Sequence, residues 1–334
     1  MKKFCLHNLR KFVINMQQKF GEREILKFRH ESVMPDEVID ALKINSAGIY
    51  LDCTLGGGGH SFRIGNRLDE GGLLIGIDRD VDAIQAAKEK LAELKCRVEI
   101  VHENFSNLEN VLADLNVEKI DGVLFDLGVS SYQIDTAERG FSYMHDAPLD
   151  MRMDRSKNFS AFNVINGYDE ESLKKIFREY GEEKFSGRIA RKIVDARKNS
   201  PIKTTGELVK LIESAVPKIS TGGHPAKRVF QAVRIEVNGE LKILEDSVKA
   251  AIRRLKIGGR IAVITFHSLE DRIVKNTFND MARNCICPKN FPVCVCNHRA
   301  EIKICGKAKS AASEEVEKNS RAKSAKLRVA EKIL

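Results

Sequence analysis

Short apolar segments alternate with amphipathic segments from about residue 30, and this alternation limits the possible folds more than any other feature of the chain. Four apolar segments follow one another at a spacing of about 25 residues, and a fifth comes much later: Gly48–Cys53, Leu73–Asp78, Val98–His102, Gly122–Asp126 and Arg260–Phe266. The segment Asp82–Leu94 between two of them has the apolar periodicity of a helix. This pattern predicts an α/β fold with a doubly wound, largely parallel sheet. Ligands of such sheets bind at the carboxyl ends of the strands.

The alternation is interrupted after Asp126. Three helical segments follow without a convincing strand between them, namely Glu170–Tyr180, Lys184–Lys198 and Thr205–Ala215. A helix over Leu241–Leu255 and the strand Arg260–Phe266 then resume the pattern. We therefore expect one α/β domain, residues 30–134 and 228–334, that contains a helical insertion, residues 135–227. Residues 1–29 form an N-terminal extension that we expect to be poorly ordered.

Length and composition exclude several classes of protein. The chain has 334 residues, of which 43% are hydrophobic and 31% charged, as in ordinary globular proteins, so collagen-like, coiled-coil and wholly disordered chains are excluded. No stretch approaches the ~18 apolar residues of a membrane-spanning helix, and we expect no membrane association. The N-terminus lacks the apolar core and cleavage site of a signal peptide, so we expect a reducing, cytoplasmic location.

The net charge of +9 is unevenly distributed. Residues 1–30 hold eight Lys and Arg against two Asp and Glu, and residues 297–334 hold ten against five. Residues 31–134 are instead acidic, with 19 Asp and Glu against nine Lys and Arg. A basic total suggests a nucleic-acid partner, although solvated basic tails explain it equally well.

The first predicted strand leads into a loop with four consecutive glycines, Gly56 to Gly59, followed by His60. Glycines at this position let a ligand approach the backbone closely, because no Cβ stands in the way. The spacing does not match the G-x-G-x-x-G fingerprint of dinucleotide-binding folds, which weakens an NAD-binding interpretation. No Lys-Ser or Lys-Thr pair follows, which excludes a phosphate-binding P-loop.

The next three strand ends each add a side chain suited to an adenosine-containing ligand. Asp78 ends the second strand and can accept hydrogen bonds from both ribose hydroxyls. Phe105 follows the third strand, where an adenine ring could stack, and Asp126 ends the fourth. A glycine-rich loop, an acid, an aromatic and an acid on consecutive strand ends form the layout of an S-adenosylmethionine site. Each signal alone is weak, since such residues are structural about half the time.

Longer blocks of sequence carry a resemblance to a known family: HESVM (residues 30–34), GGGGHS (56–61), GIDRD (76–80), FDLGVSS (125–131), DTAERGFS (135–142), PLDMRMD (148–154), FQAVRIEVN (230–238), FHSLEDR (266–272) and RAKSAKLR (321–328). The chain resembles the bacterial 16S ribosomal RNA cytosine-N4 methyltransferases from about residue 28 to residue 332. The resemblance implies a Rossmann-like class I methyltransferase sheet.

The resemblance also implies an activity and its partners. The enzyme would transfer a methyl group from S-adenosylmethionine to the N4 amine of one cytosine in the decoding centre of 16S rRNA, within the small ribosomal subunit. The resemblance is compatible with a homodimer. The implied cofactor-binding residues are Gly58, Gly59, His60, Asp78, Phe105, Asp126 and Gln133, of which His60 and Gln133 rest on the resemblance alone.

Two alternatives to this function stay open. The protein could methylate another nucleic acid such as DNA, or it could be a ribosome-assembly protein that binds RNA without catalysis. The DNA alternative is weakened because DNA amino-methyltransferases carry a Pro-Pro-aromatic turn after the fourth strand, where this chain has LGVSS.

Methyl transfer to a cytosine amine requires hydrogen-bond acceptors beside the nucleophile. The amine lone pair is delocalised into the ring, and acceptors for its protons turn the lone pair toward the methyl group and stabilise the developing positive charge. The loop from Asp126 to Ser131 follows the fourth strand, where such acceptors are needed, and we predict catalytic roles for Asp126 and Ser130.

Two further segments have a functional and a structural interpretation each. His267 and Glu270 follow the last strand, and they either line the substrate pocket or cap the next helix, with Glu270 paired to Arg272 or solvated. The insertion carries seven cationic side chains opposed only by Asp195: Lys184, Arg188, Arg191, Lys192, Arg197, Lys198 and Lys203. They form either an RNA-binding face or a solvated helix surface.

Four of the eight cysteines form two C-x-C pairs, Cys285 with Cys287 and Cys294 with Cys296. Four thiolates could hold a structural zinc ion, although common zinc sites use pairs spaced C-x₂₋₄-C. Reduced thiols in a surface hairpin are the alternative. Neither takes part in the predicted chemistry.

Overall fold

The computed structural model describes residues 32–334 except 218–222, 286, 288–292, 294 and 297. The predicted N-terminal extension, residues 1–29, lies outside the described residues. No helix in the described part of the chain is long and apolar enough to cross a membrane.

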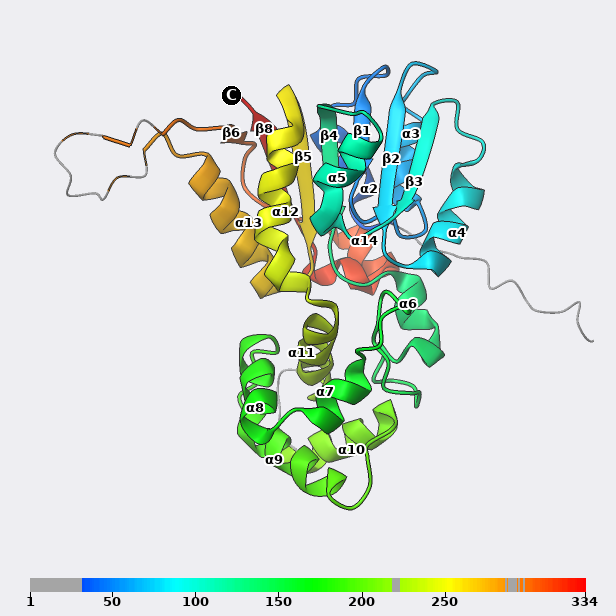
Figure 1. The fold of residues 1–334 in the computed structure, drawn as a ribbon, viewed down its shortest axis with the longest axis vertical. Coiled ribbons are helices and arrows are strands. Elements are labelled where there is room, and N and C mark those ends of the chain that lie inside the picture. The colour runs from blue at the N-terminus through cyan, green and yellow to red at the C-terminus, as the bar shows by residue number, and fades with distance from the viewer. Residues whose placement is uncertain (1–31, 218–222, 286, 288–292, 294, 297) are drawn as a thin grey trace, which may run out of the picture. The chain divides into compact units, whose positions relative to one another are not determined.

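A single sheet organises the α/β part of the protein (Figure 1). Its strands are ordered β3-β2-β1-β4-β5-β8-β6, with β7 paired to β8. The first five are parallel: β3 (Arg97–His102), β2 (Leu73–Asp78), β1 (Ile49–Asp52), β4 (Ile120–Asp126) and β5 (Leu255–Thr265). The strand order reverses between β1 and β4, which confirms the predicted doubly wound α/β fold. The loops after β1 and β4 therefore flank the switch point where such folds bind ligands.

Side-chain alternation along the strands builds a core on each face of the sheet. Leu51 and Val123 belong to a cluster with α5 (Leu108–Asp114), α12 (Glu240–Arg254) and α13 (Ser268–Met281). Their neighbours Tyr50 and Leu124 point to the other face, which is covered by α2 (Pro35–Leu42), α3 (Gly59–Gly65) and α4 (Val81–Leu91). Burial on both faces explains why the central strands β1, β2 and β4 are mostly apolar, whereas the edge strand β3 is less buried and contains Arg97 and Glu99.

The antiparallel strand β8 (Lys326–Lys332) lies between β5 and β6 (Ile302–Ile304). The sequence does not reveal this strand, because charged residues such as Arg328 and Glu331 interrupt its apolar ones. It also did not predict the elements that precede β8, which are β7 (Lys309–Ser310), α14 (Ser313–Lys318) and η3 (Ser320–Ser324).

A separate helical cluster follows β4. It contains α6 (Ser131–Asp135), η2 (Ala137–Arg139), α7 (Ala161–Gly167), α8 (Glu170–Glu179), α9 (Ser186–Arg197), α10 (Thr205–Ala215) and α11 (Ala226–Asn238). Helices α7 to α11 share a hydrophobic core of their own, built around Phe177, Ile189 and Val233. Helix α11 runs across residue 228, where the predicted insertion ends. The domain bounds stay a prediction.

Candidate functional site

The loop after β1 brings the backbone close to the carboxyl edge of the sheet. Gly58 has φ +74°, a conformation that side chains rarely adopt, and a Cβ there would lie 3.3 Å from Ala87 of α4. Gly59 then begins α3, and the buried His60 follows it. Glycine at position 58 is therefore required by the turn and by helix packing, in addition to any role in ligand approach.

Asp78 ends β2 and faces this loop. One carboxylate oxygen accepts a hydrogen bond from Gly56 N at 2.7 Å, and the other accepts one from Asp80 N at 2.8 Å. These bonds fix the orientation of the carboxylate, and each oxygen retains a second lone pair for a ligand hydroxyl. Burial raises the pKa of Asp78 above its ordinary value, an effect that the two hydrogen bonds partly offset.

Phe105 lies just after β3, in η1 (Phe105–Asn107). Its ring packs edge-on against Phe125 of β4, with ring centroids 5.6 Å apart. The side chain is partly exposed, so one part of the ring is held by the core and another can contact a ligand.

A group of acids surrounds the end of β4. Asp126 is only partly exposed, and its Oδ2 lies 3.6 Å from Nε2 of the buried His60. Burial raises the pKa of Asp126 well above its ordinary value, and the nearby Asp52 and Glu270 raise it further. Its Oδ1 is buried and has no hydrogen-bond partner in the described structure. A buried acceptor without a partner is costly unless a ligand supplies the donor.

Asp52, at the end of β1, is a residue that the sequence analysis missed. It is fully buried and accepts hydrogen bonds from Ser61 Oγ at 2.7 Å and Thr54 N at 3.1 Å. Burial raises its pKa to about 6, although both hydrogen bonds act in the opposite direction. Its position at a strand end, next to the glycine loop, was the signal that could have identified it.

Gln133 and Ser130 form the N-terminus of α6. Ser130 Oγ accepts a hydrogen bond from Gln133 N at 3.2 Å, and Gln133 Oε1 accepts one from Ser130 N at 3.1 Å, which completes a capping box. The amide of Gln133 also donates to Asp80 at 2.7 Å. Gln133 therefore links the β4 loop to the β2 loop, and the predicted catalytic residue Ser130 has a structural role as a helix cap.

A buried ion pair, also missed in the sequence, completes this link. Arg139 of η2 is 2% exposed and donates to Asp80 at 2.9 Å and to the carbonyl of Arg152 at 3.0 Å. Asp80 and Arg139 lie in GIDRD and DTAERGFS, two blocks that carry the family resemblance, but nothing in these blocks indicates that the two residues pair. The pair joins the strand-end site to the first residues of the helical cluster.

His267 and Glu270 follow β5 and form the cap of α13. The backbone N–H groups of Phe266 and His267 donate to Glu270 at 2.8 and 3.2 Å, and His267 Nε2 lies 3.1 Å from the same carboxylate. Burial would raise the pKa of Glu270, but His267 holds it below its ordinary value. Both residues therefore cap α13, and His267 also lines a cavity. The predicted Glu270–Arg272 pair does not form, because Arg272 pairs with Glu182 at 3.4 Å.

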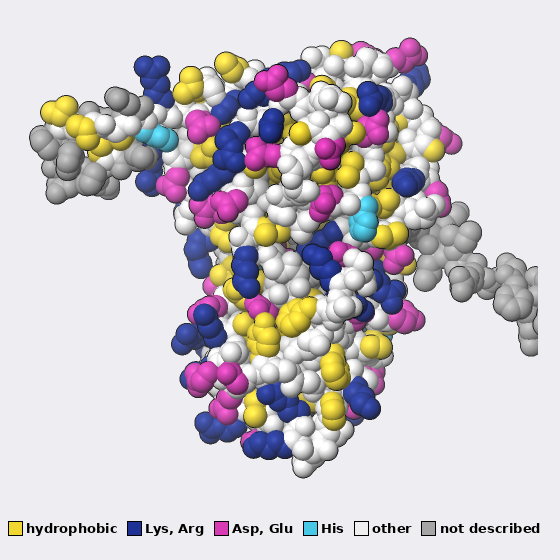
Figure 2. Space-filling view, viewed as in Figure 1, with side chains coloured by type: hydrophobic (Ala, Val, Ile, Leu, Met, Phe, Trp, Pro, Cys, Tyr) yellow, Lys and Arg dark blue, Asp and Glu magenta, His cyan; other side chains and the backbone are white. Residues whose placement is uncertain are grey.

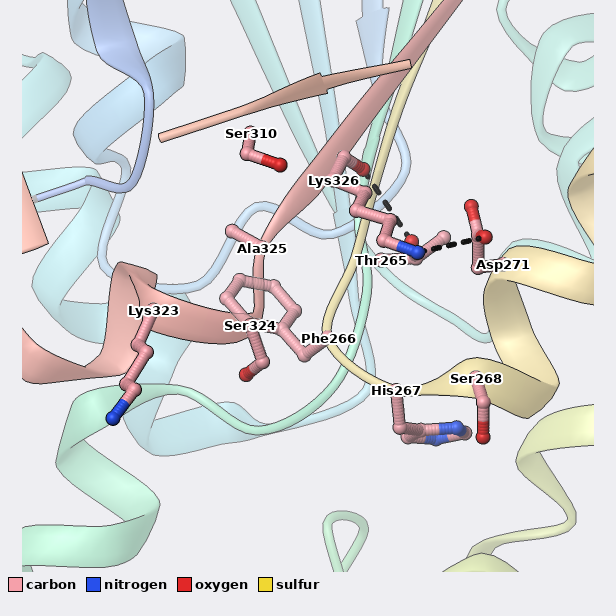
Figure 3. A pocket seen from close by; sticks show the side chains of 10 residues that line it. All are labelled: Thr265, Phe266, His267, Ser268, Asp271, Ser310, Lys323, Ser324, Ala325 and Lys326. Atoms are coloured by element: carbon pink, nitrogen blue, oxygen red, sulfur yellow. Dashed lines mark hydrogen bonds and ion pairs between the residues drawn. The ribbon is translucent and has the colours of Figure 1, made fainter. Parts of the chain in front are cut away.

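A cavity of about 260 Å³ opens beside this cap, between the end of β5 and the segment before β8 (Figure 3). Its lining includes one aromatic ring, two cations and several hydroxyl or imidazole groups: Phe266, His267, Ser268, Lys323, Ser324 and Lys326. The Phe266 ring also lies against Gly128, where a Cβ would approach it to 3.5 Å. The cavity therefore adjoins the loop that follows Asp126.

The model of the MraW methylase family matches residues 27–333 of the chain. The chain belongs to this family. Three similar curated proteins are each named Ribosomal RNA small subunit methyltransferase H. The one from Clostridium botulinum (strain Loch Maree / Type A3) is 56% identical over 310 residues, 92% of this chain and 100% of the relative. Those from Clostridioides difficile (strain 630) and Brevibacillus brevis are both 53% identical over 311 residues, covering 92% of this chain and 100% and 99% of the relatives.

The strand-end residues fit the cofactor of a methyltransferase. S-adenosylmethionine carries a ribose diol, an adenine ring and a positively charged sulfonium. Asp78 offers an oriented carboxylate, Phe105 offers a ring face, and Asp126 offers a buried acceptor without a partner. The site is rich in acids, which suits a cationic ligand.

The basic residues of the insertion are less uniform than the sequence indicated. Arg191 pairs with Glu170 of α8 at 3.3 Å, so Asp195 is not the only opposing acid. Arg197 donates to the backbone carbonyls of Ile165 and Tyr168 and has a structural role. Lys184, Arg188 and Lys192 remain exposed. Figure 2 shows Lys and Arg interspersed with Asp and Glu over this region.

Three of the four cysteines in the C-x-C pairs are described, and Cys294 lies outside the described residues. The sulfur atoms of Cys285, Cys287 and Cys296 lie within 4.8 Å of one another.

Proposed function

We propose that this protein is an S-adenosylmethionine-dependent methyltransferase that modifies the N4 amine of a cytosine in the decoding centre of 16S rRNA. The observation that carries the proposal is the convergence of Asp78, Phe105 and Asp126 with the glycine loop at the switch point of the sheet. Membership of the MraW methylase family and the names of the relatives support the rRNA substrate.

Cofactor binding is assigned to the loops after β1, β2, β3 and β4. Asp78 would accept the ribose hydroxyls, Phe105 would contact the adenine ring, and the backbone of Gly58 and Gly59 would allow close approach. His60 and Gln133 hold Asp126 and Asp80 in place, which makes them positioning residues in this structure. When bound, S-adenosylmethionine supplies the methyl group as an electrophile.

Catalysis is assigned to Asp126 and the loop behind it. The unpartnered Oδ1 of Asp126 can accept a hydrogen bond from the cytosine amine, which orients the nitrogen lone pair and stabilises positive charge on the nitrogen. The proton can then leave through the same hydrogen bond, to Asp126 or to water. The hydroxyl of Ser130 caps α6 through its lone pair, so it retains a proton to donate toward the base.

Recognition of the RNA is assigned to the cavity beside α13. The Phe266 ring can stack on a base, and Lys323 can neutralise a phosphate. Lys326 lines the same cavity but pairs with Asp271 at 3.4 Å. The exocyclic amine of a paired, stacked cytosine is not accessible to the cofactor, so the target base must be unpaired or turned out of its stack. We also infer a bacterial cytoplasmic location, where small ribosomal subunits occur.

A transfer assay tests the proposal. Isotopically labelled S-adenosylmethionine is incubated with the protein and with small ribosomal subunits, naked 16S rRNA or duplex DNA, and the product nucleoside is identified by mass spectrometry. We expect N4-methylcytidine in 16S rRNA. Preferred transfer to DNA would refute the substrate, and binding to subunits without transfer to any acceptor would favour a non-catalytic assembly protein. Light scattering on the same preparation tests the homodimer.

A further inference from the structure

We propose that Cys285, Cys287 and Cys296 are ligands of a structural zinc ion that closes the loop between α13 and β6. This site lies outside the proposed methyl-transfer chemistry and does not depend on it. Three thiolates supply three of the four positions of a tetrahedral site.

The distances between the sulfur atoms fit a shared metal ion. All three lie within 4.8 Å of one another, and Cys285 Sγ is 3.8 Å from Cys296 Sγ. Zinc–sulfur bonds of about 2.3 Å in a tetrahedron place the sulfurs about 3.8 Å apart. A disulfide requires about 2.0 Å, so the arrangement is that of thiolates around a centre and not of a cystine.

The chemistry of the segment favours a thiolate-bound metal. Residues 282–300 contain the cations Arg283, Lys289 and Arg299 and neither Asp nor Glu. Nearby cations lower the cost of forming thiolates, which are the form that binds a metal. A segment without carboxylates does not offer the oxygen-rich ligand sets of calcium and magnesium, whereas thiolates bind soft metals, of which zinc forms the common structural sites.

The described hydrogen bonds of this loop include ties at its two ends. Its ends are tied by Glu301 N to Met281 O at 2.9 Å and by Ala300 N to Asn284 Oδ1 at 3.2 Å. Beyond these ties, the described apolar residues Val293 and Val295 are 68% and 66% exposed, so they do not form a core. Small segments without a core of their own are commonly stabilised by a metal.

Metal analysis of the full-length protein tests the proposal. The protein is purified under reducing conditions without a metal-affinity tag, and its zinc content is measured by mass spectrometry. We expect about one zinc per chain, and about none in the Cys285→Ser/Cys287→Ser double variant. Cys305→Ser is the matched control, because Cys305 lies in the same part of the chain but outside the cluster, and it should retain the zinc.

A measurement on the unaltered chain keeps the test independent of how the variants fold. Cobalt(II) is added to protein stripped of metal, and its absorption reports tetrahedral thiolate coordination. The proposal is overturned if the purified protein holds no zinc and takes up neither zinc nor cobalt. It is also overturned by a Cys285–Cys296 disulfide in peptides mapped without reduction, or by iron with acid-labile sulfide in place of zinc.

Discussion

The strand-end site has two halves, one just after β2 (the β2 half) and one at the ends of β1 and β4 (the β4 half). Their buried acids lie in different electrostatic environments. At the end of β2, Asp80 is matched by the guanidinium of Arg139 at 2.9 Å and by the amide of Gln133 at 2.7 Å. At the ends of β1 and β4, Asp52 and Asp126 have raised pKa values, and His60 lies 3.6 Å from Asp126. Asp80 in the β2 half is therefore already paired, whereas burial disfavours the charged forms of Asp52 and Asp126 in the β4 half, and a cationic ligand would stabilise those forms. The β2 half therefore suits positioning of a ligand, and the β4 half suits catalysis.

Removing the cation of the β2 half should have the largest effect. Arg139→Ala leaves Asp80 buried without its partner, which should reduce the free energy of unfolding by about 3–5 kcal/mol. Chemical denaturation measures the loss. Arg63→Ala is the control, because its pair with Asp36 is exposed and its loss should cost about 1 kcal/mol or less. Equal losses in both variants would show that the β2 half is not held by this pair.

Neutralising the acid of the β4 half should affect the rate instead of the fold. Asp126→Asn retains the size of the side chain but weakens the acceptor for the amine proton, so kcat should fall by about 10²–10³-fold, the range seen when one transition-state hydrogen bond is removed. Cofactor affinity should change by less than about tenfold. Single-turnover transfer and calorimetry separate the two effects. Asp114→Asn, on the exposed surface of α5, should leave both unchanged. A normal kcat in Asp126→Asn would remove the assigned role.

Asp78→Asn should mainly lower the affinity for the cofactor and affect kcat less. The amide provides one acceptor where the carboxylate provides two, and losing one charge-assisted hydrogen bond, about 1.5–3 kcal/mol, weakens binding of S-adenosylmethionine by about 10–100-fold. Titration calorimetry measures the affinity. The exposed Asp69, which also accepts backbone and side-chain hydrogen bonds, gives the control Asp69→Asn. Unchanged affinity in Asp78→Asn would contradict the assignment of the ribose to β2.

The smallest expected effect concerns the pH dependence of stability. The pKa of Asp52 is about 6 in the folded protein and 3.8 ordinarily, so between these values the unfolded chain loses its proton first and stability falls as the pH rises. The resulting loss in the free energy of unfolding is complete above pH 6 and is at most about 3 kcal/mol. Asp52→Asn removes it but also weakens an acceptor for Ser61, so we expect a net gain of about 1 kcal/mol at pH 7 and none at pH 4. Unfolding curves at both values would show whether the gain appears only at the higher pH.

The sequence was informative wherever function depends on strand ends. Parallel strands place their carboxyl ends at one edge, so the positions of Asp78, Phe105 and Asp126 followed from finding the strands. It was uninformative where side chains far apart in the chain pair through tertiary packing. Arg139 meets Asp80 across 59 residues, and Arg191 meets Glu170 because α8 packs on α9.

Helix caps were a second source of ambiguity. Ser130, His267 and Glu270 carry functional groups suited to catalysis, and the same groups satisfy backbone donors at the starts of α6 and α13. A sequence pattern cannot separate these roles, because both require a polar side chain immediately after a strand. The hydrogen-bond geometry in the structure was needed to separate the two roles.

The place of β8 between β5 and β6 imposes an order on how the sheet forms. Strand β8 is the last strand of the sheet along the chain, and it meets β5 in pairs such as Arg260 with Glu331, 71 residues apart. On its other side, β5 reaches β4 only across the helical insertion. Contacts of such high separation form late, because the loop between them must close first. Until then β5 is an open edge with buried-type residues, Ile261 and Val263, along it. We therefore expect the newly made chain to be most prone to aggregation through β5, in the interval before its last strand arrives.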